Sequence, residues 1–135
     1  LTVSTVKHAH HSFDIDHNGT DSFRHRAAGA REVLLSSRSR WALMHENKSE
    51  AEPSLADLLA KLQPVDIVLV EGFKRERHSK IEAHRSGTGT PLIALEDDSI
   101  RAIASDADQA VQGRPTFDLN DTGGIANFIL KELKL

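Results

Sequence analysis

The chain has 135 residues, with 17 Lys and Arg against 20 Asp and Glu, a formal charge of −3 and no cysteine. The length fits one domain over residues 1–135, and the lack of cysteine excludes disulfides, thiolate metal sites and a cysteine nucleophile. Without a basic excess, an apolar run of about 18 residues or a signal-peptide pattern, the chain is expected to bind neither nucleic acid nor membranes and to be cytoplasmic.

The N-terminal region is expected to hold a strand, a long polar loop and a short helix. Residues 1–6 alternate apolar and hydroxyl side chains, which is typical of a strand, whereas residues 7–20 lose all apolar periodicity. A helix over residues 22–29 follows, with Asp21 as its N-cap and Gly29 at its end. The polar loop therefore leaves the carboxyl end of the first strand.

The central region predicts two strands, a helix and a third strand. Residues 31–36 and 40–45 are strand-like runs with no helix between them, which indicates an antiparallel addition at a sheet edge. Residues 54–62 place leucines on one helical face, and Pro64 stops this helix. The β-branched run of residues 66–70 predicts a strand buried on both faces of a parallel sheet.

The C-terminal region continues this alternation. Further strands are expected over residues 80–84, 91–95, 101–105 and 116–119, followed by an amphipathic helix over residues 125–135. Because strands alternate with helices through most of the chain, the predicted fold class is α/β, with a mainly parallel sheet flanked by helices.

An acid at a strand end is the sharpest chemical signal. Glu71 and Gly72 directly follow the apolar run of residues 66–70. Ligands of open α/β sheets lie beyond the carboxyl ends of the strands, where a carboxylate can hold Mg²⁺ and a glycine lets the backbone approach a phosphate. The same pattern is compatible with a solvated acid that has no ligand.

The loop after the first strand is rich in His and Asp. A phosphate is the natural partner of Lys7, which is a mobile point charge at a strand end. Asp14 and Asp16 offer oxygen ligands for a hard cation. A transition-metal site built from histidines is the alternative, although no established zinc-site spacing is present. Its candidate ligands are His8, His10 and His11.

Arginines gather around the predicted short helix, at Arg24, Arg26 and Arg31. Arginine suits bidentate recognition of phosphate or carboxylate, so these residues are compatible with a small anionic ligand. A second basic group, over residues 74–80, is interleaved with acids. A charge run of this kind is more often a solvated face.

Several motifs occur together in one order. They are Val-Ser-Thr-Val-Lys-His-Ala-His-His over residues 3–11, Phe-Asp-Ile-Asp over 13–16, Gly-x-Asp-Ser-x-Arg-His-Arg-x-Ala-Gly-Ala over 19–30 and Asp-Ile-Val-Leu-Val-Glu-Gly-Phe-Lys over 66–74. In this combination the chain closely resembles the MobB family of molybdopterin-guanine dinucleotide biosynthesis adaptor proteins, from residue 1 to at least residue 85.

The resemblance implies a P-loop NTPase-like fold, GTP and Mg²⁺ as ligands, a homodimer, and at most weak GTPase activity. It also implies a role assisting the guanylyltransferase that attaches GMP to molybdopterin. By position, residues 7–16 would be a switch-like loop near the terminal phosphate, and residues 71–72 would match a Walker B element. The residues so assigned are Lys7, His8, Arg24 and Gly72 for the nucleotide and Asp16 and Glu71 for the metal.

Guanine recognition is assigned less directly. Asp97 or Asp98 follows the strand expected over residues 91–95, and a carboxylate can accept hydrogen bonds from N1–H and N2–H₂ of guanine. An acidic run such as that over residues 96–98 is more often a solvated turn. Of the two, Asp97 is taken as the candidate for binding the base.

The chain departs from the family pattern in one respect: it contains no Gly-x-x-x-x-Gly-Lys-Ser/Thr phosphate loop. A strand, this loop and a helix are expected ahead of residue 1, so we expect an incomplete chain rather than a degenerate domain, and poor GTP binding by these residues alone. Two other functions stay open. One is a nucleotide-independent dimerisation or interaction module, and the other is a His-rich divalent-metal-binding protein.

Overall fold

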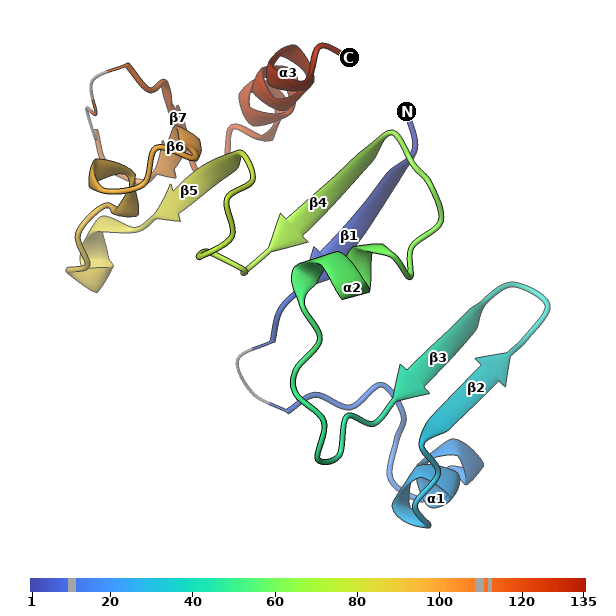
Figure 1. Ribbon diagram of the computed structural model, residues 1–135. Coiled ribbons are helices and arrows are strands. Elements are labelled where there is room, and N and C mark those ends of the chain that lie inside the picture. Colours follow the sequence, from blue (N-terminus) through green and yellow to red (C-terminus); the bar gives the residue numbers. More distant parts are fainter. Residues whose placement is uncertain (10–11, 109–110, 112) are drawn as a thin grey trace. The chain divides into compact units, whose positions relative to one another are not determined.

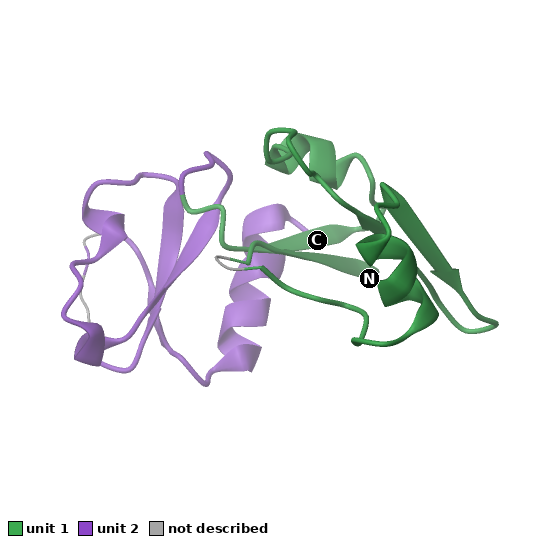
Figure 2. Ribbon diagram, turned by 90° about the horizontal axis from the view of Figure 1, so that it is seen from below, with its two compact units in different colours: residues 1–74 green, residues 75–135 purple. Residues whose placement is uncertain are grey.

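The chain forms two compact units (Figure 2). The computed structural model describes residues 1–9, 12–108, 111 and 113–135. Residues 1–74 form the first unit and residues 75–135 the second. None of the helices in the described part of the chain is both long and apolar enough to cross a membrane.

The first unit contains a pair of parallel strands (Figure 1). β1 (Val3–Lys7) and β4 (Ile67–Glu71) pair over their whole length, in a register that places Lys7 opposite Glu71. Both strands lie within two residues of their predicted positions. The two strand ends that carry the expected site residues therefore lie next to each other.

Polar contacts at the opposite end of these strands help to fix the register. The backbone N–H and the hydroxyl of Thr2 donate to one carboxylate oxygen of Asp66, at 2.6 and 2.9 Å. The backbone bond to Thr2 is the main reason why the pKa of Asp66 lies below its ordinary value. A slip of one residue would break these bonds and turn every side chain of the strand to the other face.

The expectation that β4 is buried on both faces is wrong. Ile67 is buried, but Leu69 is 44% exposed. In the described part of the chain, β4 pairs only with β1, and the nearby helix α2 (Leu55–Leu59) is short. So small a sheet and helix provide too little surface to cover both faces of the strand.

The helices of the first unit have well-defined caps. Thr20, not Asp21, is the N-cap of α1 (Asp21–Ala27), because its hydroxyl accepts from the N–H of Phe23. Asp21 is instead the first helical residue, where its negative charge interacts favourably with the helix dipole. In α2, Ser54 and Asp57 form a reciprocal capping box.

Helix α2 ends earlier than the leucine spacing predicts. The α-helix stops at Leu59, and Lys61 and Leu62 continue it only as tight turns to the carbonyls three residues back. Pro64 disfavours helical backbone only from Gln63 on, so the tight turns over residues 60–62, and not the proline, mark the end of the α-helix.

The predicted antiparallel pair is confirmed. β2 (Glu32–Ser36) and β3 (Trp41–His45) form a two-stranded sheet of their own rather than extending the β1–β4 ladder. Met44 is buried on one face of this hairpin, whereas Leu34 and Trp41 on the other are 64% and 68% exposed. The hairpin therefore has one packed face and one apolar face open to solvent.

The second unit is built on a parallel sheet with the order β5-β6-β7. Its elements are β5 (Lys80–His84), β6 (Ile100–Ser105), β7 (Thr116–Asp118) and α3 (Thr122–Leu133). The core gathers around Ile103, with Ala94 and Ile100, and the rings of Phe117 and Phe128 join β7 to α3 at 5.6 Å. The α/β class with parallel strands is thus confirmed.

The strand predicted over residues 91–95 is wrong. Two short 3₁₀ helices, η1 (Ser86–Thr88) and η2 (Ile93–Leu95), lie between β5 and β6. The buried carboxylate of Glu82 accepts from the N–H groups of Ile93 and Ala94, both at 2.8 Å. Because this side chain satisfies the donors that a strand would offer to a neighbour, the segment coils against β5.

Helix α3 begins three residues before its predicted start. Asp121 caps it by accepting from the N–H of Gly124 at 2.9 Å. A β-carbon at position 124 would collide with the Asp121 carboxylate. Gly124 therefore lies in the first turn of the helix, although the predicted range over residues 125–135 left it outside.

Candidate functional site

The carboxyl ends of β1 and β4 bring an acid and a base together. Lys7 Nζ lies 2.8 Å from Glu71 Oε1, and the two side chains are 68% and 70% exposed. An ion pair this exposed contributes little to stability, so both groups can turn toward a ligand at small cost. The position, beyond the carboxyl ends of parallel strands, is where ligands of α/β sheets bind.

Gly72 follows Glu71 in a backbone conformation that favours glycine, with φ of +88°. A β-carbon there would lie 2.8 Å from the Cβ of His8, and the N–H of His8 donates to the carbonyl of Glu71 at 2.9 Å. The glycine is required both for its φ and for the close passage of the two chain segments. It is the only residue type that meets both conditions without strain.

His8 is held beside these residues by two further side chains. Its Nε2 lies 2.7 Å from Oε1 of Glu52, and its ring is 4.9 Å from the ring of Phe73. Phe73 has φ of +48°, an uncommon value for an aromatic residue. Sequence analysis missed Glu52, because no motif or periodicity marks the polar segment that contains it.

Asp16 lies in a different set of contacts. Arg26 Nη2 donates to Oδ1 of Asp14 at 2.8 Å and to Oδ1 of Asp16 at 2.7 Å, and its Nη1 lies 3.6 Å from Glu46. The bond to Asp16 is the main cause that raises the pKa of Arg26 above its ordinary value. Among the described residues, Asp16 makes no hydrogen bond or ion pair with Lys7 or Glu71.

Asp14, Asp16, Arg26 and Glu46 form a cluster in which Asp16 is buried and Arg26 partly buried, whereas Asp14 and Glu46 are exposed. The side chain of Asp16 is only 3% exposed. Its Oδ2, and Nε of Arg26, are buried and find no hydrogen-bond partner in the described part of the chain. The structure therefore places Asp16 as the partner of an arginine rather than as an open metal ligand.

Arg24 and Asp97 have other partners. Arg24 is exposed on α1 and lies 3.8 Å from Asp21. Asp97 belongs to the second unit, where it accepts from Lys80 Nζ at 2.8 Å and from Ser99. These bonds hold the pKa of Asp97 far below its usual range, and the bond from Lys80 has the largest effect. Its assignment to guanine stays a prediction.

The residues at the ends of β1 and β4 fit a magnesium–nucleotide ligand in their chemistry. Glu71 offers a solvent-accessible carboxylate, which suits a cation that keeps several waters, and Lys7 offers a point charge for phosphate. No group of three or more His, Asp or Glu side chains in the described residues could hold a metal ion by protein ligands alone. His10 and His11 lie outside the described residues.

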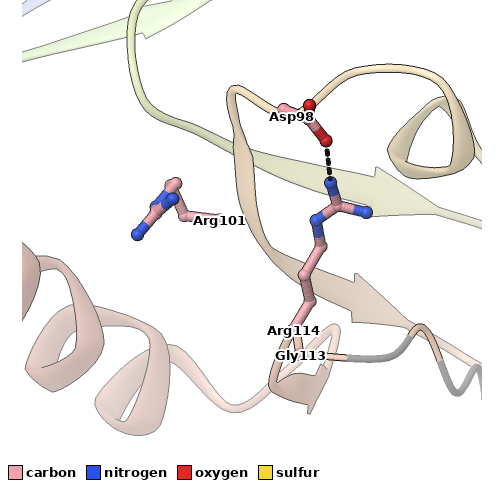
Figure 3. A pocket seen from close by; sticks show the side chains of 4 residues that line it. All are labelled: Asp98, Arg101, Gly113 and Arg114. Atoms are coloured by element: carbon pink, nitrogen blue, oxygen red, sulfur yellow. Dashed lines mark hydrogen bonds and ion pairs between the residues drawn. The ribbon is translucent and has the colours of Figure 1, made fainter.

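A separate polar pocket of about 450 Å³ lies in the second unit (Figure 3). Its lining residues are Asp98, Arg101, Gly113 and Arg114. Arg114 points toward Asp98 at 3.3 Å and also donates to the carbonyl of Ala94. Asp98, the alternative to Asp97 for guanine recognition, lines this pocket, whereas none of the residues assigned to phosphate or metal does.

Comparison with known proteins agrees with the resemblance seen in the motifs. Residues 1–106 match the family model of molybdopterin guanine dinucleotide synthesis protein B, MobB. The molybdopterin-guanine dinucleotide biosynthesis adapter protein of Escherichia coli K12 is 38% identical over 129 residues, which cover 93% of this chain and 73% of that protein. The protein of the same name from Haemophilus influenzae is 37% identical, covering 96% and 71%.

Solved structures show the same fold. MobB of Bacillus subtilis superposes with a TM-score of 0.70 at 22% identity, over 98% of this chain and 78% of that one. The MobB homologue from Bacillus stearothermophilus gives a TM-score of 0.64 at 23% identity, over 98% and 77%. With the family model and both relatives in agreement, the chain belongs to the MobB family of molybdopterin guanine dinucleotide synthesis proteins.

Proposed function

We propose that this protein is a cytoplasmic, homodimeric adapter of molybdopterin guanine dinucleotide synthesis that binds GTP with Mg²⁺ and assists the guanylyltransferase. The adapter role rests on the family and on the names of its relatives. One observation carries the nucleotide proposal: Lys7 and Glu71 lie opposite each other at the carboxyl ends of two paired parallel strands.

Each residue at the ends of β1 and β4 has a distinct task in this proposal. Lys7 binds a terminal phosphate as a point charge, and Glu71 holds Mg²⁺ directly or through one of its waters. Gly72 lets the backbone after Glu71 pass close to His8, where a β-carbon would clash. Mg²⁺ held by Glu71 would supply positive charge beside the phosphates, because Lys7 alone offsets only part of their charge and Glu71 adds a negative one.

The test is titration calorimetry of GTP into the full-length protein, with Mg²⁺ or with EDTA. Glu71→Gln keeps the shape of the side chain but removes its charge. We expect about tenfold weaker binding with Mg²⁺, equivalent to about 1.4 kcal/mol, and little change in EDTA. Glu96→Gln removes an exposed acid of the second unit and serves as the control. Equal affinities in wild type and Glu71→Gln would remove Glu71 from the metal site.

A second candidate, a nucleotide-independent interaction module, is favoured by the open apolar face of the hairpin, where Leu34, Trp41 and Leu43 are exposed. Sedimentation of the protein with purified guanylyltransferase, with and without GTP, separates the two functions. The adapter proposal expects a complex that GTP strengthens. A complex whose stability does not depend on GTP would favour the interaction module.

Stoichiometric zinc in the purified protein would favour the His-rich metal-binding alternative.

A further inference from the structure

The polar pocket of the second unit has more positive than negative side chains in its lining. Arg101 and Arg114 line it together with Asp98 and Gly113, and its volume of about 450 Å³ falls within the usual range of small-molecule sites. Figure 3 shows Arg101 apart from the contact between Arg114 and Asp98. The two guanidinium groups therefore border the pocket at separate places, and an anion inside it would meet both.

Arg101 keeps hydrogen-bond donors available to a ligand. Its Nε donates to Glu132 at 2.7 Å, and its side chain is 52% exposed. Within the described part of the chain, its two Nη nitrogens have no hydrogen bond or ion pair. Such a pair of nitrogens matches two oxygens of a phosphate or carboxylate. Arg101 can thus bind an oxyanion without giving up its bond to Glu132.

Arg114 is oriented by neutral groups and only weakly neutralised. Its Nη1 donates to the carbonyl of Ala94, and its Nη2 lies 3.3 Å from both the carbonyl of Asp97 and Oδ1 of Asp98. The side chain of Arg114 is mostly buried, whereas that of Asp98 is fully exposed. Because water screens Asp98, this acid compensates the charge of Arg114 only in part. The charge that remains favours an anion in the pocket.

We propose that this pocket binds a small phosphate monoester, with its phosphate on the two Nη nitrogens of Arg101 and in the field of Arg114. A phosphate monoester carries about two negative charges near neutral pH, which suits two guanidinium groups better than the single charge of a carboxylate. The volume leaves room for a polar body, such as a sugar, beside the phosphate. Asp98 repels the phosphate and lowers the affinity. The proposal does not rest on the nucleotide proposed for the first unit.

The test is an NMR titration of the isotope-labelled full-length protein with ribose-5-phosphate in EDTA, which excludes magnesium-dependent binding. We expect the amide signals of residues 98–101 and 113–114 to shift. Ribose, which lacks the phosphate, should shift none of them, and equal shifts with ribose would overturn the proposal. Inorganic phosphate should bind at the same residues at least about threefold more weakly, because it leaves most of the pocket empty. Equal or tighter binding of inorganic phosphate would reject the monoester.

Substitutions of the lining residues should change the affinity in opposite directions. We expect Arg101→Gln to raise the Kd of ribose-5-phosphate about fivefold to tenfold, through loss of a bidentate charged contact. Arg77→Gln removes an exposed arginine of the same unit that does not line the pocket, and should change the Kd less than about twofold. Asp98→Asn should lower the Kd about twofold to threefold, because it removes a repulsive charge. Unchanged binding in Arg101→Gln, or weaker binding in Asp98→Asn, would contradict the proposed site.

Two further variants separate binding from a structural role of Arg101. Arg101→Gln also breaks the ion pair with Glu132, so Glu132→Gln, which breaks the same pair but keeps the arginine, is measured beside it. Glu132→Gln should not raise the Kd, and a rise equal to that in Arg101→Gln would reject direct binding by Arg101. Loss of ribose-5-phosphate binding in Lys7→Gln would place the phosphate at the ends of β1 and β4 and overturn the proposal.

Discussion

Gly72 shows how one residue joins the fold of the first unit to its candidate site. Gly72 and Gly19 have nearly the same backbone conformation, with φ of +88° and +89°. Only at Gly72 would a β-carbon meet another residue, namely His8 at 2.8 Å, whereas Gly19 has open space around it. The two glycines therefore separate the cost of positive φ from the cost of a steric clash.

We expect Gly19→Ala to lower the free energy of unfolding by about 1 kcal/mol, from backbone strain alone. Gly72→Ala should cost about 1 to 3 kcal/mol more, because β1 and β4 must also move apart. Urea unfolding of both variants measures the difference. Equal decreases in the free energy of unfolding would mean that the backbone near His8 can move away from a β-carbon at position 72 at little cost.

At this scale the sequence predicts contacts made by residues at strand ends and misses those made by loops. Lys7 and Glu71 could be paired because each ends a recognisable strand, and parallel neighbours end at the same edge. The contacts of Glu52 with His8 and of Arg26 with Asp16 depend on how irregular segments turn back. No periodicity encodes that path, so their partners could not be predicted.

The β2–β3 hairpin is an element whose two faces differ in burial. Met44 is buried on one face, while Leu34 on the other is exposed. We expect Met44→Ala to cost about 2 to 5 kcal/mol, because it leaves a cavity in packed surroundings. Leu34→Thr, the control on the open face, should stay within about 0.5 kcal/mol. Fluorescence of Trp41, the single tryptophan, follows unfolding of the hairpin. A large loss in Leu34→Thr would show that this face is covered in solution.

Elements were predictable where their own residues decide their structure. The hairpin strands, β5 and α2 follow from local pattern and capping, and each was expected within a few residues. The 3₁₀ helix over Ile93–Leu95 was not, since it depends on the carboxylate of Glu82 from a neighbouring strand. An apolar run with proline before it does not show which donors another element will satisfy.

At the scale of the whole molecule, the charged residues determine how stability depends on pH. The formal charge of −3 at pH 7 is small, so general charge repulsion lowers the stability of the folded protein little at neutral pH. Individual carboxylates with lowered pKa values matter more. Asp97 is the clearest of them, because Lys80 and Ser99 both donate to it.

The sign of this effect follows from linkage. The pKa of Asp97 is lower in the folded protein than in the unfolded chain, where it is about 3.9. Its contribution to stability is therefore complete above about pH 5 and is lost progressively as the pH falls below about 4 toward the folded value. Acid should weaken the second unit through this group.

We expect Asp97→Asn to lower the stability of the second unit at pH 7 and to differ less from wild type at pH 3, because the wild-type carboxylate loses its advantage in acid. Hydrogen exchange over residues 80–105, measured from pH 7 to pH 3, reports on the strands around it. Asp98→Asn removes an exposed carboxylate from the next residue and controls for the change in net charge. A gap between Asp97→Asn and wild type that stays constant with pH would show that the bond to Lys80 does not depend on the charge of Asp97.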